Sequence, residues 1–365
     1  MLDWLACAVA GRGEPAARAA RSLGDEVVAL GAAGHVLDFD DTYAPGLAHL
    51  SAPTAPAALV VAASVGATVG ETLAAYAAGF EATGALSAAN HPALRERGWH
   101  PTAVCGAVGA AVTAARLLGC SEDAAAGLAV VQASGLQAAF GSDGKALQVG
   151  LAAAAGVRAA RLAAAGASAG EEVIAGFEAA YGARWSLSDG RRAVDANWIK
   201  AYPCCLQTHS SIEAAAALDG AVPPGEIVVV VHPVSRLTAF RDDVATGLEA
   251  KFSIPYLVAY TLLHGPPDVA AFAAVDEPAR ALARDRVRVR TDPDVAESAA
   301  VLLAGERQLA RVEAALGSPA RPMDPAALAG KVRSLAGTAL EGALDDDAAP
   351  VARVLAAVQV TERRA

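Results

Sequence analysis

Residues 35–49 gather several side chains that can do acid–base chemistry, in a chain otherwise rich in alanine, valine and leucine. Buried polar groups cost free energy unless they have partners, so a crowded polar block in an apolar sequence indicates a site. Carboxylates and imidazoles can transfer protons, and a hydroxyl can hold a carboxylate. The block contains His35, Asp38, Asp40, Asp41, Thr42 and His49.

This block has three interpretations when it is taken alone. The simplest is helix capping by Asp40, Asp41 or Thr42, with the imidazoles merely hydrogen-bonded. A second is a divalent metal site that includes His49, although no second ligand cluster with recognisable spacing follows it. A third is the Asp-x-Asp-x-Thr motif of haloacid-dehalogenase-type phosphatases, whose nucleophilic Asp ends a buried strand. That fold needs a parallel sheet alternating with helices, whereas the first half of this chain has a helical composition.

Two further candidates lie before expected helices. His100 precedes Pro101, and proline is favoured at the first turn of a helix, so His100 is expected at a helix entrance. A single histidine there is more often a hydrogen-bonded structural residue than a catalyst. Lys145 follows the Gly-rich loop 141–144, which can present an ammonium group to an anion, although an exposed loop lysine is ordinary.

The remaining candidates lie beyond residue 195. Lys200 and His209 fall where the composition changes, and domain junctions favour ligand clefts. Cys204 and Cys205 are adjacent small residues for which packing is the better interpretation. Tyr256 offers a phenol that could donate a proton or hold a carboxylate, although a lone tyrosine usually packs with a polar handle.

These side chains must be positioned by two kinds of structure. Up to about residue 195 the sequence is Ala-rich with Gly or Pro at intervals typical of packed helices. Its small-residue face Gly106, Gly109, Ala110 and Thr113 can dock closely against another helix. Helices are expected over 53–65, 70–84, 101–118, 121–138, 147–165 and 169–181.

The composition then changes to β-branched and alternating segments. Strands are expected over 226–232 and 286–290 and in a hairpin over 299–312, with a helix over 243–264. Helices over 326–336 and 348–358 return the chain to the first domain. The predicted fold is therefore mainly α, with a large all-helical domain and a smaller α/β domain. Their expected boundaries are 1–195 with 326–365, and 196–325.

Charge and composition exclude several classes of protein. The net charge of −10 is spread along the chain, so there is no clustered cationic face for nucleic acid. The uncharged stretch 42–70 is too rich in Pro, Gly and Ala for a membrane span. Five cysteines without disulfide or zinc-knuckle spacing indicate reduced thiols, and the N-terminus lacks a basic export signal. A cytoplasmic protein is expected.

Five blocks in this order resemble the MmgE/PrpD family, which includes 2-methylcitrate dehydratase, cis-aconitate decarboxylase and iminodisuccinate epimerase. The resemblance covers nearly the whole chain. The blocks are Leu-Asp-Phe-Asp-Asp-Thr with a following His, Gly-Trp-His-Pro-Thr, Lys-Ala-Tyr-Pro-Cys-Cys with Thr-His, Glu-Ala-Lys-Phe-Ser-Ile-Pro-Tyr, and Arg-Pro-Met before a Lys-Val-Arg helix.

The resemblance implies a helical domain capped by a smaller α/β lid, with the site between them, and a homodimer without metal or organic cofactor. The family often has Lys-x-x-His-x-Gly after the Gly-rich loop, whereas Gln148 replaces that histidine here, and glutamine cannot titrate. The family's active-site positions fall on Asp38, Thr42, His49, His100, Lys145, Lys200 and Tyr256.

The implied substrates are small di- or tricarboxylates that lose or gain a proton at a carbon next to a carboxylate or imine. We expect His49 as general base or acid, Asp38 as the group that orients an imidazole, and His100 as a second proton-transfer group. Lys145, Lys200 and Thr42 would hold carboxylates, and Tyr256 would close from the lid. Dehydration is expected first and epimerisation second, with decarboxylation on the same scaffold. A catalytically inactive carboxylate-binding homologue or scaffold is the non-enzyme alternative.

Overall fold

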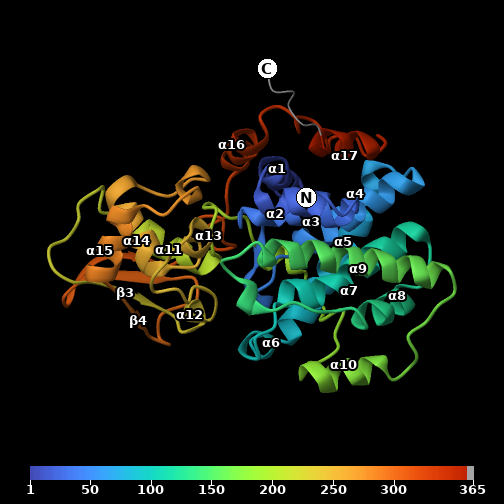
Figure 1. Cartoon of the computed structure of the whole chain (residues 1–365), viewed down its shortest axis with the longest axis horizontal. Coiled ribbons are helices and arrows are strands. Elements are labelled where there is room, and N and C mark those ends of the chain that lie inside the picture. The colour runs from blue at the N-terminus through green and yellow to red at the C-terminus, as the bar shows by residue number, and fades with distance from the viewer. Residues whose placement is uncertain (360–365) are drawn as a thin grey trace.

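The Ala-rich half of the chain folds into the packed helices of the larger lobe, as its composition predicts (Figure 1). The computed structural model describes residues 1–359. The helices of this lobe are α1 (Leu2–Gly11), α2 (Pro15–Arg21), α3 (Glu26–Val36), α4 (Ser51–Val65), α5 (Val69–Ala89), α6 (Ala93–Glu96), α7 (Pro101–Leu118), α8 (Glu122–Val130), α9 (Gly144–Ala164) and α10 (Val173–Tyr181).

Helix α7 is the central helix of this lobe and packs against α4, α5, α8 and α9. Its glycines allow this close packing, because a side chain at Gly106 would meet Pro53 of α4, and one at Gly109 would meet Thr83 of α5. The predicted small-residue face is thus confirmed. Within residues 1–359, α7 alone is long and apolar enough to cross a membrane, and 83% of it is buried among its neighbours. It is therefore a core helix.

Helix α8 ends earlier than predicted, and the chain from residue 131 to 143 forms a loop before α9. Gly135 in this loop has φ = 135°, which a helix cannot contain. The loop is pinned to the start of α7, since His100 N–H donates to Gly135 O (3.0 Å) and Leu136 forms a β-bridge with Trp99. This loop, rather than a longer helix, lies beside His100.

The smaller lobe contains a four-stranded sheet of order β4-β3-β5-β6 with its own helices (Figure 1). The hairpin predicted over 299–312 is present and turns at Gly305, which has φ = 60°. The lobe contains β3 (Ile227–Val231), β4 (Val287–Thr291), β5 (Ala300–Ala304), β6 (Arg307–Val312), α11 (His209–Ala216), α12 (Val234–Thr238), α13 (Gly247–Ala250), α14 (Ile254–His264) and α15 (Glu277–Arg286).

The single helix predicted over 243–264 is wrong, because the chain breaks between α13 and α14. Ser253 has an extended backbone, and its side chain accepts a hydrogen bond from the N–H of Tyr256. Pro255 occupies the first turn of α14, where the missing N–H costs nothing. The break places Lys251 and Phe252 between the helices, where they face the other lobe.

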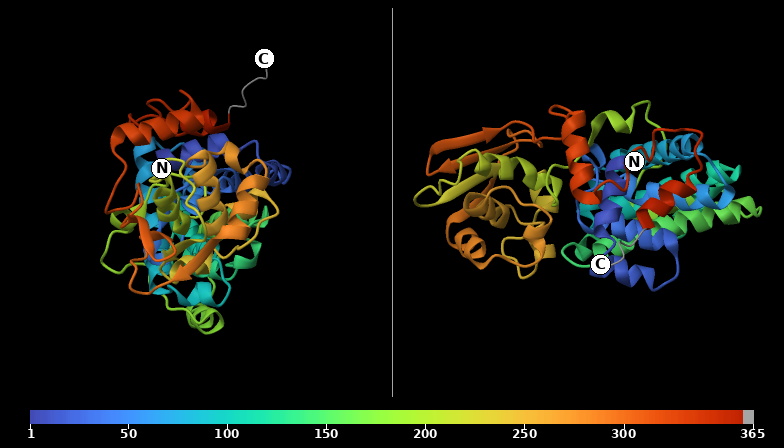
Figure 2. Two further views of the ribbon diagram at one scale, coloured as in Figure 1. Left: turned by 90° about the vertical axis from the view of Figure 1, so that its left-hand side faces the viewer. Right: turned by 90° about the horizontal axis from the view of Figure 1, so that it is seen from above.

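The chain then returns to the helical lobe through α16 (Pro325–Ala336) and α17 (Ala352–Gln359). Figure 2 shows these helices covering one side of that lobe, where α16 packs on α1 and α17 packs on α4 and α1. Their apolar side chains share one core with Trp4 and Leu5 of α1. The mainly helical fold class is confirmed.

A two-residue pairing joins the first polar block to the junction between the lobes. β1 (Thr42–Tyr43) pairs in antiparallel fashion with β2 (Asn197–Trp198), with Thr42 opposite Trp198. Residues more than 150 positions apart in sequence are thereby fixed side by side. This pairing brings Lys200, just after β2, next to Asp38, just before β1.

Candidate active site

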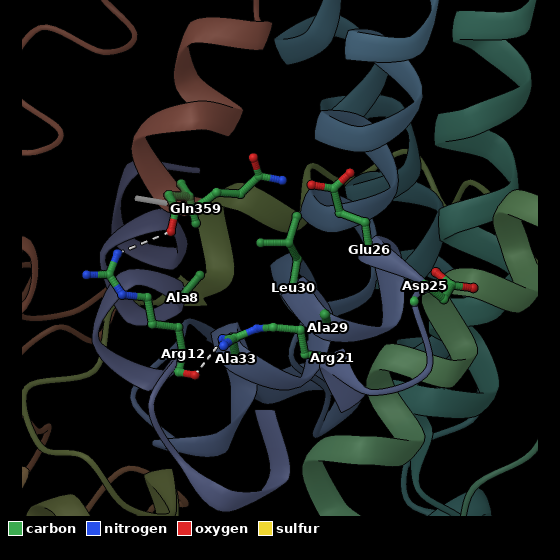
Figure 3. Close-up of a pocket in the computed structure, with 11 residues that line it drawn as sticks. Ala8, Arg12, Arg21, Asp25, Glu26, Ala29, Leu30, Ala33 and Gln359 are labelled. Carbon is green, nitrogen blue, oxygen red and sulfur yellow. Dashed lines mark hydrogen bonds between the residues drawn. The ribbon is translucent and has the colours of Figure 1, made fainter. Parts of the chain in front are cut away.

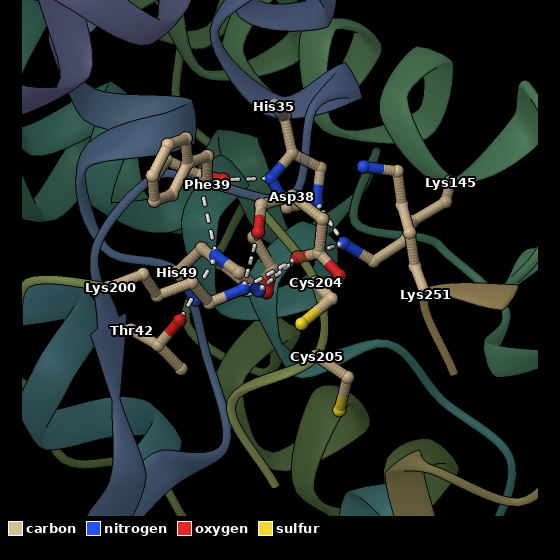
Figure 4. A network of polar contacts seen from close by, with 12 residues as sticks. His35, Asp38, Phe39, Thr42, His49, Lys145, Lys200, Cys204, Cys205 and Lys251 are labelled. Atoms are coloured by element: carbon tan, nitrogen blue, oxygen red, sulfur yellow. Dashed lines mark hydrogen bonds and ion pairs between the residues drawn. The ribbon is translucent and has the colours of Figure 1, made fainter. Parts of the chain in front are cut away.

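Asp38 is the centre of a buried charge cluster (Figure 4). It follows α3 with φ = 52°, a left-handed conformation that Asp tolerates better than most residues. Its Oδ1 accepts hydrogen bonds from the Lys200 ammonium at 2.7 Å and the Lys145 ammonium at 3.1 Å. Lys200 also donates to the main-chain carbonyl of Asp38 at 2.9 Å. One cation from α9 and one from the junction after β2 thus converge on one carboxylate.

These contacts set the ionisation of the cluster. Burial alone would raise the pKa of Asp38, but Lys145 and then Lys200 lower it well below its usual range. Burial would lower the pKa of Lys200, and Asp38 raises it above the usual value instead. Burial lowers the pKa of Lys145, which is the second residue of α9 and buried, not an exposed loop residue. Asp38 is therefore ionised throughout the neutral range.

A second chain of hydrogen bonds runs from Lys145 through two imidazoles. Lys145 Nζ donates to His35 Nε2 at 2.8 Å, so His35 Nδ1 carries the ring proton and donates to Asp40 Oδ2 at 2.9 Å. His49 Nδ1 lies 3.1 Å from the same oxygen and 3.4 Å from Thr42 Oγ1. Because Asp40 is an ionised acceptor, His49 also carries its proton on Nδ1. Its Nε2 is left with a lone pair.

The free nitrogen of His49 faces the charge cluster. Nε2 lies 3.6 Å from Asp38 Oδ1, beyond a good hydrogen bond but close enough for a proton on Nε2 to be stabilised. Burial, then the nearby Lys200 charge, lowers the pKa of His49 to about 3, against the pull of Asp40. The ring is thus neutral near pH 7. His35, a member of the polar block to which the sequence analysis assigned no role, connects the two networks.

His100 lies at the entrance of α7, as predicted, with its ring against Phe140 (centroids 4.9 Å apart) and near His35 (6.2 Å). Its Nδ1 accepts from Gln148 Nε2 at 2.7 Å. Burial, then the charges of Lys145 and other cations, lowers the pKa of His100 well below its usual value. His100 is a neutral ring that is fully buried.

Two buried cations beside the site were missed by the sequence interpretation. Lys251, in the break between α13 and α14, donates to the carbonyls of Leu37 and Pro203, each at 2.7 Å, and burial lowers its pKa to about 8. Arg95 of α6 lies 4.9 Å above the Phe140 ring, and burial lowers its pKa to about 10. Both add positive charge at the junction.

Two predicted residues are not part of the charge cluster. Tyr256 lies in the core of the smaller lobe, where its hydroxyl accepts from Asp276 N–H at 2.9 Å, so its placement at the site is wrong. A lone tyrosine on the buried face of α14 packs in the core instead of facing the cavity. His209 is buried beside Lys200, but its Nε2 lies 3.4 Å from the carbonyl of Cys204. It supports the junction loop.

A small cavity lies between the two lobes. The space free inside it is about 30 Å³, room for roughly one water molecule. A small carboxylate can enter only when its walls move. The helical lobe contributes Asp38, Thr42, Leu47, His49, Arg95, Phe140 and Lys145, and the chain of the smaller lobe contributes Cys205, Leu206, Gln207, Thr238 and Phe252.

The metal interpretation is tested by His35, Asp40 and His49, whose ligand atoms lie within 4.8 Å of one another. A cation on His35 Nδ1 would force the ring proton onto Nε2, where Lys145 already donates. It would also lie close to two ammonium groups whose charge it would oppose. This donor set suits hydrogen-bonded imidazoles better than a divalent cation.

The other two interpretations of the first block do not match the structure. Asp38 follows a helix, whereas the phosphatase motif places its Asp at the end of a buried parallel strand. Asp40, Asp41 and Thr42 do not cap the next helices, which begin after Tyr43 and Leu50. Asp40 holds two imidazoles instead.

A wider hollow on the helical lobe lacks this chemistry. Figure 3 shows it between α1, α3 and α17, with Arg12, Arg21 and Glu26 at its walls and apolar Leu30 between them. Arg12 donates to the carbonyl of Val358, and Arg21 donates to the carbonyl of Arg12. Among residues 1–359, its lining includes no histidine and no lysine.

Comparison with family models supports the sequence resemblance. The chain matches the model of the MmgE/PrpD N-terminal domain over residues 23–191 and that of the MmgE/PrpD C-terminal domain over residues 202–356. Lys200 falls between the two matched segments. A comparison with curated proteins gives no match.

Proposed function

The chain belongs to the MmgE/PrpD family, and from that premise we propose that it is a lyase of the 2-methylcitrate dehydratase type. Members of this family are generally enzymes. In the proposed reaction a proton leaves the carbon next to a carboxylate of a small polycarboxylic acid, and a hydroxyl leaves the neighbouring carbon as water. Neither a metal ion nor an organic cofactor takes part.

The observation that supports this most is a surplus of positive charge beside a neutral imidazole. Four buried cations and two ionised carboxylates lie at the junction, and Arg95, Lys145 and Asp38 among them line the cavity. This leaves two positive charges for the carboxylates of a substrate. The cations are Lys145, Lys200, Lys251 and Arg95, and the carboxylates are Asp38 and Asp40. Such a site attracts a dianion or trianion and stabilises the further charge of an enolate-like state.

His49 Nε2 is the proposed base, because it has a lone pair and is buried and neutral near pH 7. Asp40 holds the other side of the ring, and Asp38 stabilises the imidazolium that forms. The electron pair of the broken C–H bond becomes the second C–C bond. The reaction balances when the proton on His49 passes to the departing hydroxyl, which leaves as water.

The substrate carboxylates are held by hydrogen-bond donors. Lys145, Arg95 and Thr42 all line the cavity, and each can donate to a carboxylate oxygen. Because the cavity as described holds about one water, we propose that the smaller lobe or its loops move aside for binding and close again over the substrate. Tyr256 has no part in this closure.

Epimerisation or decarboxylation is the alternative on the same groups, because the same carbanion can be reprotonated or can arise from loss of CO₂. A scaffold without catalysis is disfavoured, because it would gain nothing from burying four cations at one junction.

The test is an NMR assay of the protein with citrate, 2-methylcitrate, aconitate and iminodisuccinate, each with and without EDTA. We expect turnover of one hydroxy acid to an unsaturated acid, unchanged by EDTA. Inversion or CO₂ release would instead assign the epimerase or decarboxylase. Loss of activity in EDTA with rescue by Mg²⁺ would contradict the metal-free proposal.

A further inference from the structure

Gln148 of α9 pairs with the main chain of Leu136 in both directions. Its Oε1 accepts from the Leu136 N–H at 2.9 Å, and its Nε2 donates to the Leu136 carbonyl at 3.2 Å. A main-chain N–H can only donate and a carbonyl can only accept. The orientation of the Gln148 amide is therefore fixed by its partners, since a flipped amide would oppose like groups at both contacts.

Leu136 is itself held in place by the start of α7. It forms a β-bridge with Trp99, and the next residue, Gln137, donates its N–H to Gly98 O at 2.9 Å. The partner that orients Gln148 is thus a fixed backbone segment. The loop that replaces the expected end of α8 therefore determines how the Gln148 amide faces His100.

With this orientation the second hydrogen of the Gln148 amide points to His100 Nδ1, at 2.7 Å. Nδ1 must then be the acceptor, because an N–H there would face another N–H. A neutral histidine has one ring proton, so it lies on Nε2. Nε2 is buried and has no hydrogen-bond partner within residues 1–359.

Resting on the proposed function, we propose that Gln148 is a positioning residue that holds His100 in the neutral Nε2–H tautomer. His100 then offers the substrate a hydrogen-bond donor for a carboxylate or enolate oxygen. It cannot take a proton from carbon at Nε2, which already carries one. The role expected for His100 from the sequence, proton transfer, thereby changes to electrostatic stabilisation, and His49 is left as the base.

The surroundings of His100 keep it neutral. Lys145 and Arg95 are the nearby cations, and the His35 and His49 rings complete the polar groups that face it. A protonated His100 would add a charge beside these cations and lose the bond from Gln148. A neutral imidazole N–H can polarise a developing oxyanion without giving up its proton, as the neutral histidine of triosephosphate isomerase does.

The direct test measures the tautomer without any substrate. Protein carrying ¹⁵N-labelled histidine is examined by imidazole NMR, and the His100 signals are assigned by their loss in His100→Asn. We expect an unprotonated Nδ1 and a protonated Nε2 from pH 6 to 8. A protonated Nδ1, or titration of His100 within this range, would overturn the proposal whether or not a substrate is known.

A matched variant then reverses the hydrogen bond. Gln148→Glu has the same shape, but its carboxylate can only accept, so it should draw a proton onto His100 Nδ1. We expect the NMR pattern to change to Nδ1–H or to imidazolium. With the substrate, kcat should fall by about 10- to 100-fold and the pH profile should gain an ionisation.

The outcomes separate the two proposals. The expected tautomer without turnover of any acid supports the role of Gln148 and counts against the dehydratase. Turnover of an acid by a wild type whose His100 carries its proton on Nδ1 supports the dehydratase and counts against the role of Gln148. If Gln148→Glu fails to fold, the wild-type spectrum still decides which ring nitrogen of His100 carries the proton. An unchanged spectrum and pH profile in a folded Gln148→Glu variant would overturn the inference.

Discussion

The two lobes contribute different kinds of side chain to the cavity. Among the residues that line the cavity, the helical lobe provides Asp38, His49, Arg95 and Lys145, whereas those from the smaller lobe are uncharged and form a neutral wall, with Gln207 as the most polar. Lys200 and Lys251, from the chain after residue 195, lie at the junction but do not line the cavity. Groups that exchange protons must keep fixed distances, which one packed lobe can guarantee. The neutral wall can change its shape without disturbing these distances. We infer that the helical lobe determines the reaction and that the smaller lobe selects the substrate.

The largest effect should come from removing the charge at the centre of the helical lobe. Asp38→Asn leaves two buried ammonium groups without their carboxylate, so we expect unfolding free energy to fall by about 3–5 kcal/mol and kcat by at least about 10³-fold. Urea unfolding and steady-state kinetics measure both.

The control is Asp243→Asn, which breaks the exposed pair with Arg280 and should cost less than about 1 kcal/mol. Equal costs for the two substitutions would show that the buried cluster has no special energetic role.

The base is the next test of the helical lobe. His49→Gln keeps a polar side chain of similar length but cannot accept a proton, so kcat should fall by about 10²- to 10⁴-fold with little loss of stability. His264→Gln, at an exposed imidazole of the smaller lobe, should leave kcat unchanged. Parental activity in His49→Gln would move the base elsewhere.

A smaller effect, and of a different kind, is expected from the neutral wall. Gln207→Glu introduces a negative charge opposite the substrate carboxylates without changing the size of the side chain. We expect KM to rise by about 10- to 100-fold while kcat changes much less. Gln207→Met, which is uncharged, serves as the matched variant. A loss confined to kcat would contradict the division between the lobes.

The smallest effect concerns stability. Burial raises the pKa of Asp41 from 3.8 to about 6, against a hydrogen bond from Ser51. The folded state thus binds this proton more tightly than the unfolded state, so the stabilisation is complete below pH 3.8 and is lost as the pH rises through 6. Asp41→Asn should be more stable than the wild type by on the order of 2 kcal/mol at pH 7 and not at pH 4. Urea unfolding at both pH values checks this, and an equal difference at the two would contradict it.

The sequence predicts the elements better than the contacts between them. Alanine content, glycine spacing and β-branched runs predict most long helices and all four strands of the sheet. Two helix boundaries predicted from the sequence are wrong. The end of α8 was misplaced because Gly135 has a backbone conformation that a helix cannot contain, and the break in 243–264 was missed because Ser253 caps a new helix there. The homodimer and the cytoplasmic location stay predictions.

Residue type predicts the site in part. Asp38, His49, His100, Lys145 and Lys200 meet at the junction, as the resemblance implied. No local sequence pattern reveals that Lys200 bonds to the main-chain carbonyl of Asp38, or that Gln148 bonds to His100. Lys251 lies in a block quoted for the resemblance, yet it was missed because its partners are carbonyls far away in the sequence. Tyr256 was misplaced because neither its spacing nor its type shows which face of α14 is buried.

The most direct test of the central claim is solvent exchange at the substrate carbon. The protein is incubated in D₂O with its substrate and EDTA, and the proton next to the carboxylate is followed by NMR alongside product formation. We predict metal-independent exchange or elimination at that carbon in the wild type and in His264→Gln, and none in His49→Gln. Exchange at the parental rate in His49→Gln, or none in the wild type with any polycarboxylate, would contradict the account.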